Sequence, residues 1–189
     1  MATLRHQLEI IAHRQRSLIQ ACHDKLDQLS DSQLRWSPDA KTWSIALVLD
    51  HLIKVHVATS PAFMRVLLAA PPAGDEKTQE LPYSFSDRLV VQLLSPGARF
   101  KLPVPRIFIP VEHHGSPHHL VEKLYEEFDA FEIVLNFADE KQLRGLRVSS
   151  PAGNARPSVI AYLDATVQHN KYHWQQIEAL IKDSNFPKD

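Results

Sequence analysis

Residues 158–182, SVIAYLDATVQHNKYHWQQIEALIK, carry the pattern that decides the fold. Apolar, aromatic and histidine side chains recur along this stretch at intervals of three and four residues, which is the spacing of one face of an α-helix. The members of this stripe are Tyr162, Thr166, His169, His173, Gln176 and Leu180. The sequence therefore predicts a helix over about 158–182 whose inward face contains two histidines.

The N-terminal stretch has the same periodicity. Apolar positions recur from Leu4 onward, with Gln15 in the one missing step, and they predict an amphipathic helix over about 2–29. The apolar positions of this stripe are Leu8, Ile11, Leu18, Cys22, Leu26 and Leu29. Because Cys22 lies on the stripe, we expect a buried core thiol at that position.

A second helix is predicted to begin near Ile45, since Ser44 is a good N-cap for the apolar run IALVLDHLIKVHVAT. The periodic pattern continues to Leu68. Pro61 falls inside it and should either kink the helix or divide it at Ser60.

A third helix follows Ser116 and Pro117, which supply an N-cap and a first-turn proline. Its apolar face consists of Leu120, Leu124, Phe128, Phe131 and Leu135. Glu122, Glu126 and Asp129 lie on the opposite face, where we expect them to be solvated.

The stretch 70–116 between the second and third helices contains seven of the 13 prolines and only a short helical window at 87–94. An irregular connection of this length is uncommon unless it crosses a fold or covers a functional site. We expect it to cross the bundle and to help shape the mouth of a site. Its apolar positions are Phe100, Leu102, Val104, Ile107 and Ile109.

These elements predict an all-α fold: a four-helix bundle of up-down-down-up order with a long crossover between the second and third helices. Short loops join antiparallel neighbours, so the long link is expected to join two parallel ones. The length of 189 residues fits a single domain over 1–189.

Composition excludes several classes of protein. The 21 lysines and arginines nearly balance 22 aspartates and glutamates, so no net basic field exists to hold nucleic acid or anionic lipid. A single cysteine excludes an intramolecular disulfide framework and a cysteine-based zinc ribbon, and it fits a reducing cytoplasm. No stretch approaches about 18 consecutive apolar residues, and the N-terminus is unlike a signal peptide, so we expect no membrane span.

Three histidines are candidate metal ligands. His169 and His173 are spaced i, i+4, which places both imidazoles on one helical face, one turn apart. A solvated or hydrogen-bonded pair is the alternative for this spacing. His51 lies among the inward positions of the second helix. Three histidines from two facing helices would leave an ion at least one open coordination position.

The other histidines fit this group less well. His56 lies about 140° around the helix from His51 and should not join the same site. Four more histidines cluster in EHHGSPHHL, at the start of the third helix, where side chains are usually exposed. These are His113, His114, His118 and His119.

The segments LSDSQLRWSPDAKTWSIALVLDHLIKVH (29–56) and HNKYHWQQI (169–177) resemble the DinB-like (YfiT-like) superfamily of bacterial proteins, which is distinct from the DNA polymerase of the same name. The resemblance rests on Trp-Ser at 43–44, His-Leu at 51–52 and His-x3-His-x2-Gln-Ile from 169. It implies that the metal ligands are His51, His169 and His173. One departure is Leu47, where family members often have a Glu that completes a capping box with Ser44.

No catalytic residue is singled out. Asn170 stands where a zincin-type protease would place its general-base Glu, which argues against that mechanism. Asp50 and Glu178 point away from the predicted site, and Glu127 is only a flanking candidate. Gln176 is either a hydrogen-bonding partner of a ligand or a structural glutamine. The aromatic residues expected to serve in packing are Tyr172 and Trp174.

Two classes of function follow. The first is a metal-dependent enzyme acting on a small molecule, by hydrolysis or by thiol S-transfer. The resemblance implies this class because some members of the family look like hydrolases or thiol S-transferases. The second is a noncatalytic metal- or ligand-binding bundle, related to a stress response. Three imidazoles suit divalent Zn, Ni, Fe or Cu. A small-molecule substrate or thiol is the expected partner, and the apolar faces of a bundle also allow a homodimer.

Overall fold

The structure, a computed structural model, describes residues 3–98 and 103–188. Within these ranges the chain forms six α-helices and two short 3-10 helices, with isolated β-bridges and no strand. The elements are α1 (Leu4–Leu26), α2 (Asp31–Arg35), α3 (Ile45–Ala69), η1 (Asp75–Thr78), α4 (Phe85–Leu94), η2 (Arg106–Phe108), α5 (His118–Asp139) and α6 (Val159–Ile181). The predicted all-α class is confirmed.

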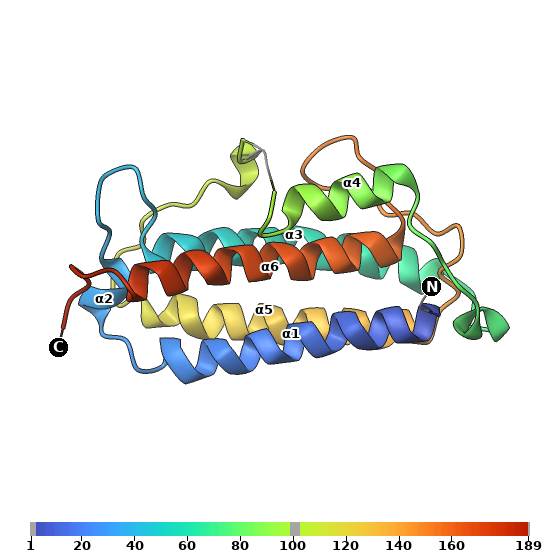
Figure 1. The fold of residues 1–189 in the computed structure, drawn as a ribbon, viewed down its shortest axis with the longest axis horizontal. Coiled ribbons are helices and arrows are strands. Elements are labelled where there is room, and N and C mark those ends of the chain that lie inside the picture. Colours follow the sequence, from blue (N-terminus) through green and yellow to red (C-terminus); the bar gives the residue numbers. More distant parts are fainter. Residues whose placement is uncertain (1–2, 99–102, 189) are drawn as a thin grey trace.

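The four long helices α1, α3, α5 and α6 lie side by side (Figure 1). α3 contacts α5 and α6, and α1 contacts the same two helices. In the view of Figure 1, α1 and α6 run from right to left, whereas α3 and α5 run from left to right. The long connection between α3 and α5 therefore joins two parallel neighbours.

The ends of the first helix differ from the prediction by a few residues. α1 spans Leu4–Leu26, and the polar segment after it contains the short helix α2, which the periodicity did not predict. α2 begins with a capping box in which Ser30 and Gln33 exchange hydrogen bonds. A helix of five residues is too short to show a repeating apolar stripe, which explains the omission.

α3 continues through Pro61 as one helix, so of the two outcomes predicted, a kink or a division at Ser60, the division does not occur. Pro61 has no N–H to donate to the carbonyl of Val57. Val57 is 52% exposed, so this side of the helix reaches water, which can solvate the free carbonyl. Phe63, on the far side of the proline, is fully buried and holds the second half of the helix in the core.

The last two long helices begin differently: α5 has Pro117, not the predicted Ser116, at its N-cap position and no side-chain cap there, whereas α6 is capped by Ser158. The Ser116 hydroxyl accepts a hydrogen bond from the His118 N–H, and Pro117 between them has helical backbone angles. The Ser158 hydroxyl accepts from the Ala161 N–H at the start of α6. The three carboxylates predicted to be solvated on α5 are exposed: Glu122, Glu126 and Asp129.

The core consists of two hydrophobic clusters, one at each end of the bundle. Between them lies a polar layer of three fully buried side chains, Gln15 of α1, His56 of α3 and Asn170 of α6. The His56 ring makes edge contacts with Phe128 and Phe131 of α5, one from each cluster. The polar layer therefore joins α1, α3 and α6, contacts α5 through these two phenylalanines, and divides the apolar core.

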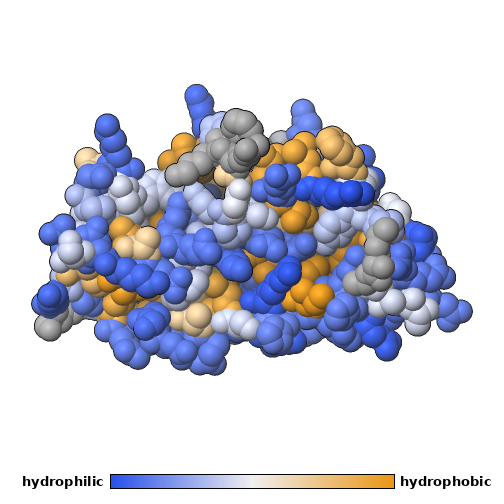
Figure 2. Space-filling view, viewed as in Figure 1, coloured by the Kyte–Doolittle hydropathy of each residue, from blue (hydrophilic) through white to orange (hydrophobic). Residues whose placement is uncertain are grey.

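The connection between α3 and α5 crosses the bundle, as predicted. Its helices η1, α4 and η2 pack against α1, α6 and α3 respectively. Figure 2 shows apolar side chains gathered over α4, where Phe85 and Leu89 are exposed. Phe100 and Leu102, two of the apolar positions expected on this connection, lie outside the described residues.

α3 is long and apolar enough to cross a membrane by length and composition alone. Core helices of bundles meet the same criterion. In this structure α3 packs against α5 and α6, and it buries the polar side chains of Asp50, His51 and His56.

Candidate metal centre

The three predicted histidines come together between α3 and α6. The Nε2 atom of His169 lies 3.4 Å from Nε2 of His51 and 3.1 Å from Nε2 of His173. The ligand atoms of all three residues lie within 4.8 Å of one another. Their predicted convergence is therefore confirmed, and it requires α3 and α6 to face each other in one register.

Hydrogen bonds orient two of the three rings. His51 donates from Nδ1 to the carbonyl oxygen of Phe108 at 2.7 Å, and His173 donates from Nδ1 to Oε1 of Gln176 at 2.8 Å. Both acceptors are oxygens, so the proton of each ring sits on Nδ1 and the lone pair of each Nε2 faces the centre. Nδ1 of His169 is buried and has no hydrogen-bond partner among the described residues.

The surroundings keep the three rings neutral. Burial, followed by repulsion from His51, lowers the pKa of His173 to about 3 despite its bond to Gln176. Burial also lowers the pKa of His51, and burial together with the neighbouring histidines places that of His169 well below its usual value. Neutral imidazoles are the form that binds a metal ion, so no proton has to leave before binding at neutral pH.

Two of the three nitrogen separations fit a tetrahedral ion. With metal–nitrogen distances near 2.0–2.1 Å, two ligand nitrogens of a tetrahedron lie about 3.3–3.4 Å apart. The two Nε2 separations of 3.4 Å and 3.1 Å are close to this value. Because the lone pairs of His51 and His173 both point at the centre, the single proton that His169 can offer would satisfy only one of them. An ion would satisfy all three.

Aromatic rings surround the histidines. The Trp43 ring lies 5.2 Å from that of His51 and stacks on that of His173 at 6.4 Å, measured between centroids. The rings of Phe108 and Tyr172 make edge contacts with His51 and His173 respectively. The sequence marked Trp43 only as part of a helix start. Its place beside two ligands depends on how the loop before α3 folds back.

Two neighbours on α6 behave differently from one another. Trp174 is buried in the core cluster near the end of α6, as expected of a packing residue. Tyr172 accepts a hydrogen bond from Nε2 of Gln176 at 3.0 Å. Since Gln176 also holds His173, the glutamine links the candidate ligand to a phenol, and Tyr172 does more than pack.

His56 does not join the group, as predicted. Its Nε2 donates to Oδ1 of Asn170 at 3.0 Å, and Nδ2 of Asn170 donates to Oε1 of Gln15 at 3.1 Å. Burial lowers the pKa of His56 to about 4, so this ring is also neutral. Asn170, which replaces the general-base Glu of a zincin, is thus part of the polar layer.

The carboxylates near the site are engaged elsewhere. Asp50 accepts from the Val111 N–H and from Nε2 of His113, each at 2.8 Å, and pairs with Lys54 at 2.7 Å. Glu127 pairs with Lys123 on its own helix. Among the described residues, the group that could hold a metal contains no carboxylate.

The cluster at the start of α5 makes protein contacts of its own. His113 binds Asp50, His118 lies 3.6 Å from Asp31, and Nδ1 of His119 lies 2.5 Å from the carbonyl oxygen of Ser116. The contact between His113 and Asp50 was not predicted, because it joins residues 63 positions apart through an irregular segment.

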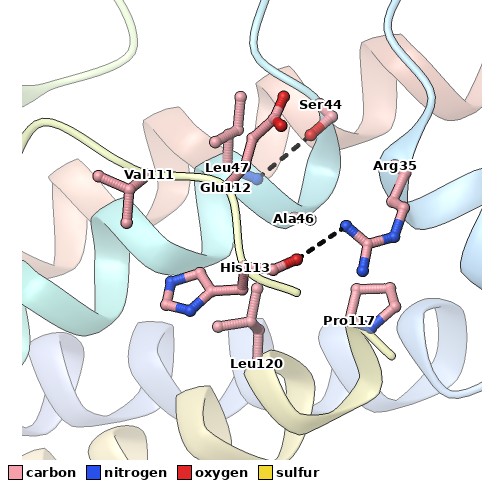
Figure 3. A pocket seen from close by; sticks show the side chains of 9 residues that line it. All are labelled: Arg35, Ser44, Ala46, Leu47, Val111, Glu112, His113, Pro117 and Leu120. Atoms are coloured by element: carbon pink, nitrogen blue, oxygen red, sulfur yellow. Dashed lines mark hydrogen bonds between the residues drawn. The ribbon is translucent and has the colours of Figure 1, made fainter. Parts of the chain in front are cut away.

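A small pocket of about 130 Å³ lies beside this segment, at the start of α3 (Figure 3). Arg35 donates to the carbonyl of His113 across it, and the Ser44 hydroxyl caps Leu47 on its other side. The three candidate ligands do not line it, so this pocket is separate from the histidine group.

Three neutral imidazoles converge here from two antiparallel helices. The protein is therefore an all-α protein with a group of side chains that could hold a metal ion. The chain belongs to the DinB superfamily, whose family model matches residues 13–177, a range that includes all three histidines. The family resemblance inferred from the motifs is therefore confirmed. Neither a curated protein nor a solved structure matches the chain.

Proposed function

We propose that this protein binds a divalent transition-metal ion through His51, His169 and His173 and acts on a small molecule as a metal-dependent enzyme. Hydrolysis and transfer of a low-molecular-weight thiol to an electrophile are the two reactions that such a centre supports. The observation that carries the proposal is the convergence of three neutral imidazoles, in which the Nε2 atom of His169 lies at near-tetrahedral spacing from those of both His51 and His173. Three protein ligands leave one tetrahedral position for water or substrate.

A divalent ion supplies a Lewis acid that lowers the pKa of bound water toward about 7 or holds a thiolate. The residues of the protein would bind the ion and orient the ligand rings. The Phe108 carbonyl and Gln176 fix the rings of His51 and His173, so that their lone pairs need no rearrangement. The rings of Trp43 and Phe108 flank His51 and limit its access to water.

A noncatalytic metal- or ligand-binding bundle is the second candidate. One observation favours it: the metal-binding group of the described residues includes no carboxylate, and Asp50 is already bonded to three donors. A reaction at this centre would have to draw its acid and base from the ion's ligands and the substrate.

Elemental analysis of protein expressed without a polyhistidine tag tests the metal site. We expect about one bound Zn, Ni, Fe or Cu per chain, lost in His169→Ala. Metal content far below one per chain after equilibration with these ions would refute the site. Turnover assays with hydrolysable esters, and with thiols plus electrophiles, then separate the two candidates. Activity that requires both the ion and His169 supports the enzyme, and stoichiometric metal without turnover supports the binding bundle.

A further inference from the structure

The segment 108–113, which begins at the last residue of η2, is attached to one face of α3 by three side chains within two helical turns. His51 donates to the carbonyl of Phe108, and Lys54 donates to the carbonyl of Ile109 at 2.9 Å. Asp50 binds the main chain of Val111 and the side chain of His113. The bond to the Phe108 carbonyl orients His51, a candidate metal ligand. The bonds made by Lys54 and Asp50 hold the segment to which that carbonyl belongs.

We propose that Asp50 is a positioning residue for the metal centre: it fixes the 108–113 segment so that the Phe108 carbonyl holds the His51 ring with Nε2 toward the ion. The proposal rests on the proposed metal site for its function, whereas its structural part concerns the protein alone.

The segment has little regular structure of its own to hold it. η2 is only three residues long, and the side chains of Ile107, Ile109 and Val111 are about half exposed. A carbonyl on such a segment is a reliable hydrogen-bond acceptor only if its main chain is fixed. The buried Phe108 side chain, the two donors that the segment gives to Asp50 and the bond from Lys54 to the Ile109 carbonyl provide this fixation.

The burial and the charge of the Asp50 carboxylate suit it to hold the segment. It is 4% exposed, and burial alone would raise its pKa. Hydrogen bonds from Lys54, Val111 and His113 outweigh burial and lower the pKa below its ordinary value, so the carboxylate stays charged. A charged, buried acceptor with three donors is a strong restraint, because each of these hydrogen bonds is charge-assisted.

A purely electrostatic role for Asp50 makes a different prediction. The negative charge of Asp50 raises the pKa of His51, and the positive charge of Lys54 lowers it. If charge alone mattered, loss of Asp50 would weaken metal binding and loss of Lys54 would strengthen it. If Asp50 and Lys54 act by holding the segment, loss of either one weakens binding.

The test uses the full chain in three variants: Asp50→Asn, Lys54→Met and, as a matched control, Asp87→Asn. Asp87 is also a buried aspartate that joins two segments, since it accepts from the Ser84 N–H and hydroxyl and from the Ser158 N–H. Ser158 precedes His169 by 11 residues, roughly 16 Å along the helix axis. Asp87→Asn should therefore lower stability without changing the site.

The first readout is the tautomer of His51 in the metal-free protein, measured by ¹⁵N NMR. We expect the Nδ1–H form in the wild type and in Asp87→Asn, and a mixture with the Nε2–H form in Asp50→Asn. The second readout is Co²⁺ affinity from the visible spectrum. We expect a 10- to 100-fold loss in Asp50→Asn, a smaller loss in Lys54→Met and no change in Asp87→Asn.

Asp50→Asn with an unchanged tautomer and Co²⁺ affinity within twofold of wild type would overturn the proposal. Tighter Co²⁺ binding by Lys54→Met would assign the effect to charge and would overturn it too. If Asp50→Asn does not fold, Lys54→Met decides by the sign of its effect. If the wild type binds no Co²⁺, the proposed function fails, while the tautomer measurement still tests the role of Asp50.

Discussion

Replacing His173 by Ala should remove the stabilisation that metal gives to the protein. His173 is 5% exposed, and its Nε2 lies 3.1 Å from that of His169. Alanine deletes one of three candidate ligands, and the remaining pair cannot form the predicted three-ligand centre. The apolar clusters that hold the bundle are untouched, so the variant should still fold.

The size of the effect follows from linkage. A ligand at 100 times its Kd stabilises the folded state by about 2.7 kcal/mol. For a chain of this length, 1 kcal/mol corresponds to roughly 2–4 °C in Tm, so Zn²⁺ at that concentration should raise the wild-type Tm by roughly 5–11 °C. The same concentration should shift His173→Ala by less than about 2 °C.

The metal-free proteins should differ less. Alanine leaves Oε1 of Gln176 without its donor and opens a space in the core, which destabilises the variant. It also ends the competition between the lone pairs of His51 and His173 for the single proton of His169. Because these two effects oppose each other, we expect apo melting temperatures within a few degrees.

The assay is differential scanning calorimetry with and without Zn²⁺, paired with a calorimetric titration. His56→Ala is the matched control, since His56 is also a buried imidazole but binds Asn170 instead of the group. It should lower the apo Tm and keep the Zn²⁺-induced shift. An undiminished shift in His173→Ala would remove His173 from the site, and failure of that variant to fold at low temperature would show a structural role.

Three further outcomes are expected. Leu47→Gln should supply the missing half of a capping box with Ser44 and stabilise the protein by about 0.5–1 kcal/mol in urea unfolding, whereas Leu47→Ala should not. The pKa of His56 in the folded protein, about 4, lies below its value near 6.5 in the unfolded chain. The free energy of unfolding should therefore be unaffected by His56 above pH 6.5 and should fall by about 1.4 kcal/mol per pH unit from there toward pH 4. Apo unfolding curves at pH 7, 6 and 5 should show this loss, and His56→Phe should show a shallower slope. Cys22 is 2% exposed and burial raises its pKa to about 12, so a thiol reagent should modify it only after unfolding. Rapid modification of the native thiol would contradict its burial.

Much of the fold and the three candidate ligands could be predicted from the sequence. Periodicity alone located the four long helices, because each buries one apolar stripe. The i, i+4 spacing and the inward position of His51 predicted the convergence that the structure contains. Local patterns sufficed here, since each residue's direction is set by its own helix.

The partners that orient the ligands could not be predicted in the same way. The acceptor of His51 is a main-chain carbonyl, that of Phe108, and any residue type provides one. The bond between Asp50 and His113 joins a helix to an irregular segment. Such contacts depend on the path of the connection, which has no periodicity to read. Gln15 was visible as a gap in an apolar stripe, but its partner across the bundle was not.

The polar layer has a consequence for how the helices find their alignment. If α6 slid by one turn, about 5.4 Å, Thr166 or Trp174 would stand where Asn170 meets His56. His56 and Gln15 would lose their partners, and each stranded polar group would cost about 1–3 kcal/mol. The same slip would put one of His169 and His173 in the place of the other and carry the second one away from His51. The alignment that pairs His56, Asn170 and Gln15 is thus the one that assembles the three imidazoles, so we expect the chain to select it during folding, before any ion binds.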